Sequence, residues 1–178
     1  MLNRIKRSLL TKYITGNVSD RKKQLISLQR AKSIGIIASI SDEESYQNIF
    51  SLFSLLQNGN KSVRMVAYID DKAVPYFCLE QLTADYFCRK DLNWYGKPVM
   101  VQVNDFMAMD FDLLIDFTDD FYLPVYTILQ LSKAKMITGA NNHYRELYDL
   151  FIDGNGINKR TLLDNINTYS HQLTGEKI

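Results

Sequence analysis

Acidic and hydroxyl-bearing side chains follow several short apolar runs in this sequence. If these runs are parallel strands, their carboxyl ends meet at one edge of a sheet, where α/β proteins bind their ligands. Oxygen atoms gathered there would accept Mg²⁺ or the hydroxyl groups of a sugar, whereas a bare phosphate would be repelled. The alternative, which we favour, is that they only cap helices and solvate turns. The candidate ligand-binding residues are Ser41, Asp42, Asp70, Asp71, Thr118, Asp119, Asp120, Asn141 and Asn142.

Catalytic motifs are sparse. The turn after the first apolar run holds Asp42 and Glu43, the candidates for a general base, but it lacks the glycines that let backbone N–H groups approach a phosphate. Neither a P-loop nor a dinucleotide fingerprint occurs in the sequence. The two histidines, His143 and His171, are too few for a histidine-rich metal site, and no serine lies in a glycine-flanked elbow. We therefore expect a non-enzymatic domain with no metal site and no cofactor, unless Mg²⁺ binds at the acidic edge.

The net charge of +1 conceals a strong asymmetry. Residues 1–32 contain nine lysines and arginines and one acid, a local charge of +8, so the remaining residues carry −7. An amphipathic helix is expected at the start of this segment, because Leu2, Ile5, Leu9 and Tyr13 recur every three or four residues. Such a basic helix can bind anionic lipid, nucleic acid or a protein partner, including a second copy of the chain, or lie on its own acidic domain, which we favour. The candidate surface-binding residues are Arg4, Lys6, Arg7 and Lys12.

Strand-like and helix-like patterns alternate along the chain. The clearest unit is an apolar run over residues 113–117, a helix opened by Pro124, and a second run closed by Gly139. The first run is too short for a helix, and a proline fits the first helical turn, where its missing N–H would have no partner. Parallel strands require such helical crossovers. The same order occurs earlier, over residues 33–40, 44–58 and 63–69.

These units predict an α/β fold. We expect a three-layer Rossmann-like domain over residues 33–178, with a mostly parallel sheet of about five or six strands and helices on both faces. A basic helical arm over residues 1–32 precedes it. Within the arm, a second short helix is expected over residues 20–30, with Leu25 and Leu28 facing inward.

The middle of the chain is less regular. Residues 84–88 have the pattern of a short strand. Residues 93–98 form a turn whose aromatic side chains are expected to plug the edge of the core. Residues 99–103 are interpreted as one more strand, at an edge of the sheet because Pro98 precedes it.

The last part of the chain is expected to close the domain with a helix. Residues 147–152 before it fit either a strand or a helix. The helix itself is predicted over residues 159–173. Its buried side would carry Leu162, Leu163, Ile166, Tyr169 and Leu173.

The composition indicates a soluble cytoplasmic protein. Hydrophobic residues make up 46% of the chain and charged residues 23%, which is ordinary for a globular domain. The spacing of Cys78 and Cys88 marks neither a metal site nor a redox pair, so we expect free thiols in a reducing compartment. No run approaches the roughly 20 apolar residues that span a bilayer. Residues 1–10 do not form the apolar core of a signal peptide.

Three segments resemble a family of similarly sized bacterial proteins of unknown function, found mainly in Bacteroidetes. They are KDLNWYGK (residues 90–97), FDLLID (residues 111–116) and LSKAKMITG (residues 131–139). The likeness covers nearly the whole domain and the basic arm, and it implies no activity.

The second and third segments also resemble the N-terminal half of heptosyltransferase-type glycosyltransferases, where a DLxID strand leads into a helix and an AxxRIG strand. This resemblance implies a Rossmann-like half that receives an acceptor, with an acidic general base after the first strand. Only Asp42, Glu43 or Glu44 matches that acid, and the glycine that precedes it in the family is absent. The half that binds the nucleotide sugar would not fit after Gly139.

The sequence supports three classes of function. We favour a non-enzymatic cytoplasmic domain that binds a protein partner or a small ligand. The alternative is a glycosyltransferase-like enzyme or remnant with an acidic cleft at the carboxyl ends of the strands. Peripheral attachment to a membrane or to nucleic acid through residues 1–30 is compatible with either.

Overall fold

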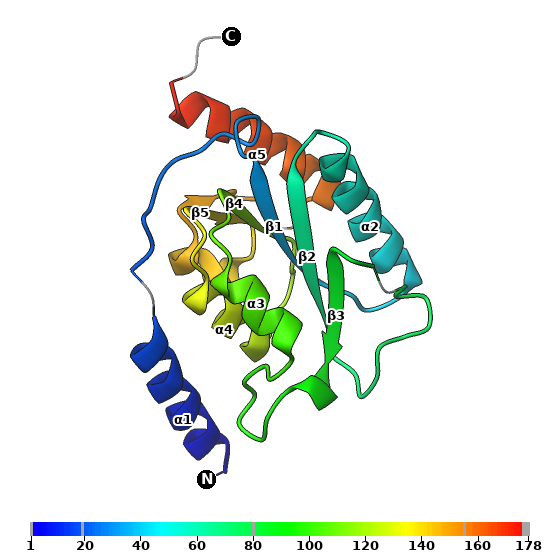
Figure 1. Cartoon of the computed structure of the whole chain (residues 1–178), viewed down its shortest axis with the longest axis vertical. Helices are drawn as coiled ribbons and strands as arrows, with labels where there is room; N and C mark the ends of the chain where they lie inside the picture. Colours follow the sequence, from blue (N-terminus) through cyan, green and yellow to red (C-terminus); the bar gives the residue numbers. More distant parts are fainter. Residues whose placement is uncertain (1, 19, 80, 155, 176–178) are drawn as a thin grey trace.

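Six parallel strands form one sheet in the order β3-β2-β1-β4-β5-β6 (Figure 1). The computed structural model describes residues 2–18, 20–79, 81–154 and 156–175. The predicted Rossmann-like α/β fold is confirmed. The strands are β1 (Ser33–Ser39), β2 (Ser62–Ile69), β3 (Ala84–Cys88), β4 (Leu113–Asp116), β5 (Met136–Gly139) and β6 (Leu150–Phe151). The helices are α1 (Leu2–Asn17), α2 (Glu43–Gln57), α3 (Val101–Ala108), α4 (Leu123–Leu131) and α5 (Lys159–Leu173), with short 3₁₀ helices η1 (Arg89–Asp91) and η2 (Asn142–Leu147).

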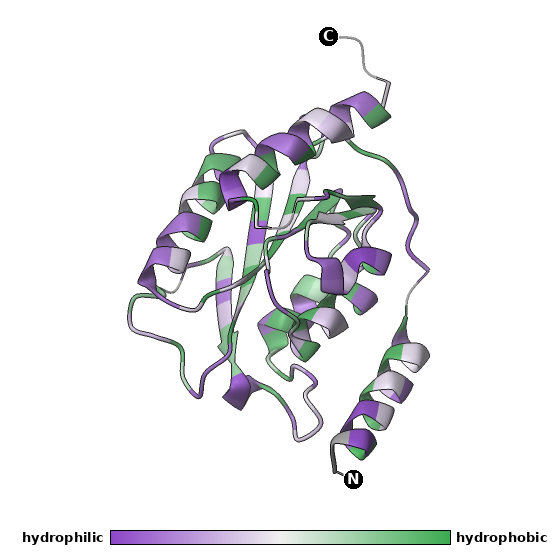
Figure 2. Cartoon of the chain, turned by 180° about the vertical axis from the view of Figure 1, so that it is seen from behind, coloured by the Kyte–Doolittle hydropathy of each residue, from purple (hydrophilic) through white to green (hydrophobic). Residues whose placement is uncertain are grey.

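Helices cover both faces of the sheet. α2 and α5 lie on one face, and α1, α3 and α4 lie on the other (Figure 1). Neighbouring residues of β1 point into opposite cores, since Ile36 packs with the residues of α2 and α5 and Ile37 with those of α3 and α4. Hydrophobic residues accordingly gather in the strands and on the helix faces turned toward them (Figure 2). Because helices bury both faces of the sheet, β1 is an almost unbroken run of apolar residues.

The chain reverses its direction across the sheet between β1 and β4. From β1 it moves outward to β2 and β3, and from β4 it moves the other way to β5 and β6. At Gly35 of β1 the missing side chain makes room for neighbouring ones, because a Cβ atom there would lie 2.8 Å from Leu114 Cδ1 and from Phe111 Cδ2. In folds of this kind, ligands bind beyond the carboxyl ends of the strands near such a reversal.

The strand predicted over residues 99–103 is wrong. That segment leads into the helix α3, and β3 is the edge strand on this side. The inward residues are Val103, Phe106 and Met107, whose spacing is that of a helix face. Val99 and Val101, which suggested a strand, are exposed.

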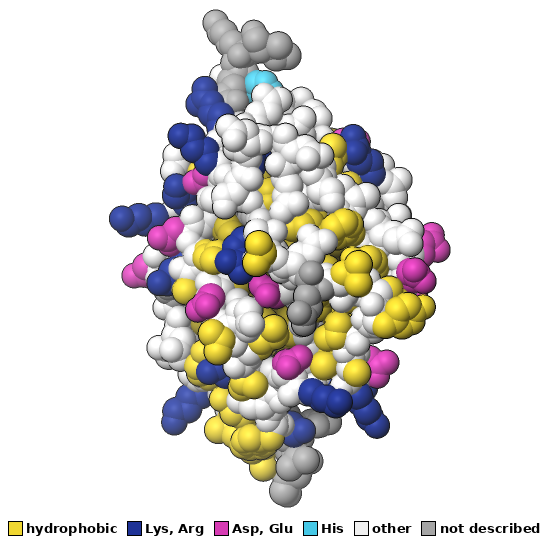
Figure 3. Space-filling model, turned by 45° about the vertical axis from the view of Figure 1, so that its right-hand side comes forward, with side chains coloured by type: hydrophobic (Ala, Val, Ile, Leu, Met, Phe, Trp, Pro, Cys, Tyr) yellow, Lys and Arg dark blue, Asp and Glu magenta, His cyan; other side chains and the backbone are white. Residues whose placement is uncertain are grey.

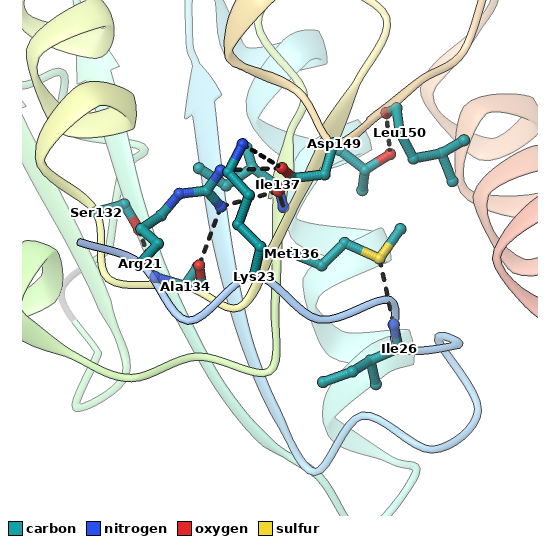
Figure 4. Close-up of polar contacts among 10 residues, drawn as sticks. Arg21, Lys23, Ile26, Ser132, Ala134, Met136, Ile137, Asp149 and Leu150 are labelled. Atoms are coloured by element: carbon teal, nitrogen blue, oxygen red, sulfur yellow. Dashed lines mark hydrogen bonds and ion pairs between the residues drawn. The ribbon is translucent and has the colours of Figure 1, made fainter. Parts of the chain in front are cut away.

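The second helix predicted in the arm is also wrong. α1 ends at Asn17, and the described part of residues 18–30 contains no helix. Arg21 instead donates two hydrogen bonds to Asp149, at 2.8 and 3.0 Å, and a third to the carbonyl of Ala134 at 3.0 Å (Figure 4). These bonds draw the segment out along the end of β5, so that Leu28 is buried but Leu25 stays 48% exposed.

Two predicted apolar stripes are only partly buried. In α1 the buried residues are Leu10 and Ile14, whereas Ile5 and Leu9 are exposed, and the side chain of Leu2 lies outside the described part. In α5 the first three predicted core residues are buried, but Tyr169 and Leu173 are exposed. In both helices the covered side differs from the predicted stripe, since Leu10 next to Leu9 and Ser170 next to Tyr169 are buried.

The segment over residues 147–152, which fitted either a strand or a helix, contains the end of a 3₁₀ helix and a short strand. η2 ends at Leu147, and the short strand β6 follows it at Leu150. Among the described residues, no helix has the length and apolar character needed to cross a membrane.

Candidate functional site

The first acidic loop caps a helix. Asp42 is the N-cap of α2, and its carboxylate accepts a hydrogen bond from the backbone N–H of Ser45 at 2.7 Å. This bond and the one from the Ser41 hydroxyl lower the pKa of Asp42, because they stabilise its charged form. A carboxylate with a lowered pKa is a poor general base near neutral pH. Its neighbour Glu43 is exposed in the first turn of α2.

The second acidic loop is held by an ion pair. The carboxylate of Asp70 accepts hydrogen bonds from Arg89 Nε at 2.7 Å and from the Tyr68 hydroxyl at 2.9 Å. The Arg89 guanidinium is the main cause of the lowered pKa of Asp70. Asp71 accepts from the backbone N–H of Lys72, and its own carbonyl accepts from the N–H of Arg89 at 2.9 Å. These contacts fix the turn that leaves β2.

The third and fourth loops do come together. Thr118, Asp119, Asn141 and Asn142 line one cavity of about 370 Å³. Lys159, which the sequence did not single out, also lines it and forms an ion pair with Asp119. The other predicted ligand-binding residues, Ser41, Asp42, Asp70, Asp71 and Asp120, do not line this cavity.

The polar groups of this cavity are largely bonded to one another. The side-chain amide of Asn141 donates to Thr118 Oγ1 at 3.2 Å and to the carbonyl of Asp120 at 3.0 Å. Its oxygen accepts from the N–H of His143 at 3.0 Å. The side chains of Asn141 and Thr118 are therefore already engaged within the protein.

The acidic edge does not assemble a metal site. Within residues 2–18, 20–79, 81–154 and 156–175, no three His, Cys, Asp or Glu residues lie close enough together to hold a metal ion. Binding of Mg²⁺ requires several oxygen ligands on one centre. The carboxylates of Asp42, Asp70 and Asp119 are instead engaged in a helix cap and two ion pairs.

A buried carboxyl group, which sequence reasoning missed, lies beneath this edge. Asp116 ends β4 and has no exposed surface. Its carboxylate accepts hydrogen bonds from the Tyr148 hydroxyl at 2.6 Å and from the N–H of Thr118 at 2.8 Å. Burial raises the pKa of Asp116 to about 6, and the two hydrogen bonds limit the rise. Because ligands cannot reach this group, we assign it to positioning the loop that carries Thr118. Its signal in the sequence was a charged residue ending an apolar strand.

A larger cleft, of about 710 Å³, lies at the same edge of the sheet but on the side of α1 and α4. Arg89 directly follows β3, and Leu123 begins α4, so both place the cleft beyond the carboxyl ends of the strands. Of the four predicted surface-binding residues, Lys12 does not line it. We call this feature the cationic cleft, lined by Arg4, Lys6, Arg7, Arg89, Leu92, Asn93, Trp94, Tyr95, Gly96 and Leu123.

One wall of the cationic cleft is a tight turn held by its own hydrogen bonds. The side-chain oxygen of Asn93 accepts from the N–H groups of Tyr95 at 3.2 Å and Lys97 at 2.9 Å. Gly96 has a φ of 94°, and a Cβ atom there would lie 3.1 Å from Leu123 Cδ2, so the position requires glycine. This turn is built before any ligand arrives.

The turn and α1 are also fastened to each other. The Lys97 ammonium lies 3.9 Å from the centre of the Tyr13 ring, a cation–π contact. Tyr13 and Tyr95 both pack against the core that contains α3 and α4. The two walls of the cleft are therefore held in a fixed relation.

The charges in the cleft are unevenly compensated. Arg89 is paired with Asp70, at 2.7 Å. In contrast, no carboxylate among the described residues forms an ion pair with Arg4, Lys6 or Arg7. The α1 side of the cleft thus presents uncompensated positive charge.

An aromatic side chain, that of Trp94, lines the same cleft. Trp94 is 59% exposed, although the sequence predicted that the aromatic residues of its turn would plug the core. Only Tyr95 does so, and its ring meets that of Trp94 edge-on, with centroids 5.5 Å apart. The signal that could have identified Trp94 is its place in a polar turn between two lysines, Lys90 and Lys97.

A separate exposed surface is apolar. The loop between β2 and β3 exposes Tyr76 by 87%, Leu79 by 62% and Leu82 by 97%. Figure 3, turned toward the β3 edge of the sheet, shows exposed hydrophobic side chains spread over this face. None of these three residues lines the cationic cleft.

The fold and its ligand-accessible edge define a Rossmann-like α/β domain with a six-stranded parallel sheet. The chain belongs to a family of unknown function, DUF6913, whose sequence profile matches residues 6–173. No curated protein and no solved structure shows significant similarity to it.

Proposed function

We propose that this protein is a non-enzymatic cytoplasmic domain that binds a phosphate-bearing ligand in the cationic cleft. The observation that carries the proposal is the convergence of Arg4, Lys6 and Arg7, without ion-pair partners among the described residues, on one cleft at the carboxyl edge of the sheet. From the sequence, these residues were predicted to lie on a basic arm, but no cleft was predicted there.

The chemistry of the cleft suits a phosphate group. Guanidinium groups donate paired hydrogen bonds to phosphate oxygens, and such charge-assisted bonds are about twice as strong as neutral ones. Since the turn over residues 93–98 is already ordered by Asn93 and Gly96, binding does not have to order it. The position also agrees with the general location of ligands in doubly wound α/β sheets.

Glycosyl transfer is a weaker account of the same structure. It needs Asp42 or Glu43 as a general base, and the carboxylate of Asp42 is engaged as the cap of α2 with a lowered pKa. In addition, the cavity that Asp119 lines with Thr118 and Asn141 includes neither Asp42 nor Asp70. We therefore place ligand binding in the cationic cleft rather than at the acidic edge.

Attachment of α1 to an anionic membrane is the second candidate. Ile5 and Leu9 are one helical turn apart and are 47% and 37% exposed, so α1 has an unburied apolar face. Against it, Arg4, Lys6 and Arg7 line the cleft, so part of the charge that would contact lipid is turned toward the protein. Sedimentation with anionic vesicles tests this candidate. If α1 attaches the protein to the membrane, Ile5→Asp and Leu9→Asp should abolish its binding to the vesicles.

Calorimetric titration with inorganic pyrophosphate tests the main proposal. The variant carries Arg4→Glu and Arg7→Glu, and the control Lys12→Glu reverses a charge on the same helix outside the cleft. Arg4 lies in the first turn of α1, where an acidic residue suits the helix dipole, and both arginines are exposed, so we expect the double variant to keep α1 folded. We expect its affinity to fall at least about a hundredfold, because charge-assisted hydrogen bonds contribute roughly 1.5–3 kcal/mol each. The control should change affinity by less than about threefold. The double variant changes the net charge by four units and the control by two, so a control loss about half as large in binding free energy would show that only net charge matters and would refute a site in the cleft.

A further inference from the structure

Trp94 lies exposed in the lining of the cationic cleft rather than in the core. It is the single tryptophan of the chain, and more than half of its side chain is exposed, at 59%. Large aromatic side chains are usually well buried, so an exposed one at the rim of a cleft needs an explanation. Its edge-on contact with Tyr95, which is anchored in the core, leaves the indole in the lining of the cleft.

We propose that the ligand is a nucleoside phosphate whose base stacks on Trp94 while its phosphates bind Arg4, Lys6 and Arg7. This inference rests on the proposed function and adds the chemical class of the ligand. A planar apolar surface beside uncompensated guanidinium groups matches the two ends of a nucleotide, an aromatic base and a charged phosphate chain. A simple inorganic phosphate has no aromatic ring to stack on the indole of Trp94.

The size of the cleft agrees with this ligand. Its volume of about 710 Å³ falls within the range of small-molecule sites, about 300–1,000 Å³. The two walls that would contact the base and the phosphates belong to segments more than 70 residues apart in the sequence, α1 and the turn over residues 93–98. The Lys97 contact with Tyr13, at 3.9 Å, holds these walls together, so base and phosphates would be recognised at one fixed spacing.

The same nucleoside phosphate chemistry is offered by a free nucleotide and by a single strand of RNA. Both place a base beside a phosphate group, and stacking on an exposed tryptophan serves either. A titration with ADP and one with an adenylate tetranucleotide separate the sources. A tetranucleotide that binds much more tightly than ADP identifies a strand as the ligand, and the reverse identifies the free nucleotide.

Fluorescence of Trp94 gives the test a direct readout, because no other tryptophan contributes. We expect ADP to quench this fluorescence and to bind about ten- to a hundredfold more tightly than inorganic pyrophosphate, as base stacking on an aromatic side chain predicts. In calorimetry, Trp94→Ala should abolish the preference for ADP, so that the ratio of the affinities for ADP and pyrophosphate falls to about one. Trp94→Phe, which keeps a ring, should retain most of the preference for ADP and guards against loss of folding in the alanine variant.

The failures of the two proposals are distinguishable. Equal affinities for ADP and pyrophosphate in the unaltered protein overturn the base-stacking inference but leave a phosphate site in place. Absence of binding by both, at millimolar concentration and low salt, overturns the proposed function itself. A preference for ADP that survives in Trp94→Ala moves the base to another surface and also overturns the inference.

Discussion

Replacing the buried carboxyl group of Asp116 by an amide is expected to change how the stability of this protein depends on pH. The Asp116 side chain is fully buried and accepts hydrogen bonds from Tyr148 at 2.6 Å and Thr118 at 2.8 Å. In Asp116→Asn, the amide oxygen can still accept from the N–H of Thr118. The amide NH₂ can donate to the Tyr148 hydroxyl, which then acts as the acceptor. The substitution therefore removes the ionisation with little change in shape.

The magnitude follows from the raised pKa. Burial moves the pKa of Asp116 from 3.8 in the unfolded chain to about 6 in the folded protein. The folded state therefore holds the proton more tightly, and the stability that this gives is fully present below pH 3.8 and is lost as the pH rises through 6. The whole loss is about 3 kcal/mol, of which about 2 kcal/mol falls between pH 4.5 and 7.5.

Urea unfolding of the unaltered protein and of Asp116→Asn, at several pH values from 4.5 to 7.5, measures this effect. The free energy of unfolding of the variant, relative to the unaltered protein, should rise by about 2 kcal/mol across that interval. Taking the difference between the two proteins removes the contributions of other groups, provided that they are far enough away to titrate independently.

Asp112→Asn serves as the control, because the pKa of Asp112 is shifted in the opposite direction to that of Asp116. Burial raises the pKa of Asp112, but hydrogen bonds from the Lys135 ammonium and from the backbone N–H groups of Lys32 and Ser33 outweigh it and leave the pKa lowered. With a lowered pKa, the Asp112 carboxylate gains its stabilising effect as the pH rises toward 3.8, so the stability lost in this variant should be nearly constant from pH 4.5 to 7.5. A stability difference for Asp116→Asn that is flat with pH, or that falls as the pH rises, would refute a raised pKa for Asp116.

Three further substitutions test parts of the structure that position the cleft and the acidic edge. Gly96→Ala places a side chain at a φ of 94°, 3.1 Å from Leu123, and should lower the free energy of unfolding by about 1–3 kcal/mol in urea titrations; an unchanged midpoint would mean that the turn differs from the one described. Arg21→Ala removes two charge-assisted hydrogen bonds from the Asp149 carboxylate, which keeps only Lys23 at 3.1 Å and the N–H of Ile137, and should cost about 1.5–3 kcal/mol. A double-mutant cycle with Asp149→Ala measures the coupling, and additive losses would argue against this ion pair. Asp42→Ala should lower the thermal midpoint, because α2 loses its cap, and should leave pyrophosphate binding intact. Loss of pyrophosphate binding in this variant would indicate that the ligand binds at the acidic edge.

The sheet could be predicted because its strands are marked locally. The run that ends at Asp116 and the helix begun by Pro124 carry their signals within a few residues. The arm could not be predicted in the same way. Residues 20–30 have a helix-like start, but Arg21 bonds to Asp149, 128 positions away, and this tertiary contact overrides the local preference. For α3, the β-branched residues before Val103 suggested a strand, and the helical spacing only becomes visible with Phe106 and Met107.

The candidate site was predictable only in pieces. The charge of Arg4, Lys6 and Arg7 and the aromatic turn at Trp94 are both visible in the sequence, but nothing local indicates that they face each other. The acidic residues were correctly associated with loops at the carboxyl ends of strands, yet sequence spacing cannot show that Asp119 pairs with Lys159. Which charges are compensated is decided by contacts between distant segments.

The most direct test of the central claim is a crystal structure of the protein soaked with pyrophosphate. Our account predicts that the bound anion lies in the cationic cleft, within hydrogen-bond distance of Arg4, Lys6 and Arg7. Pyrophosphate bound instead in the cavity lined by Thr118, Asn141 and Lys159 would contradict it, and so would a cationic cleft that stays empty at a concentration that saturates the protein in solution.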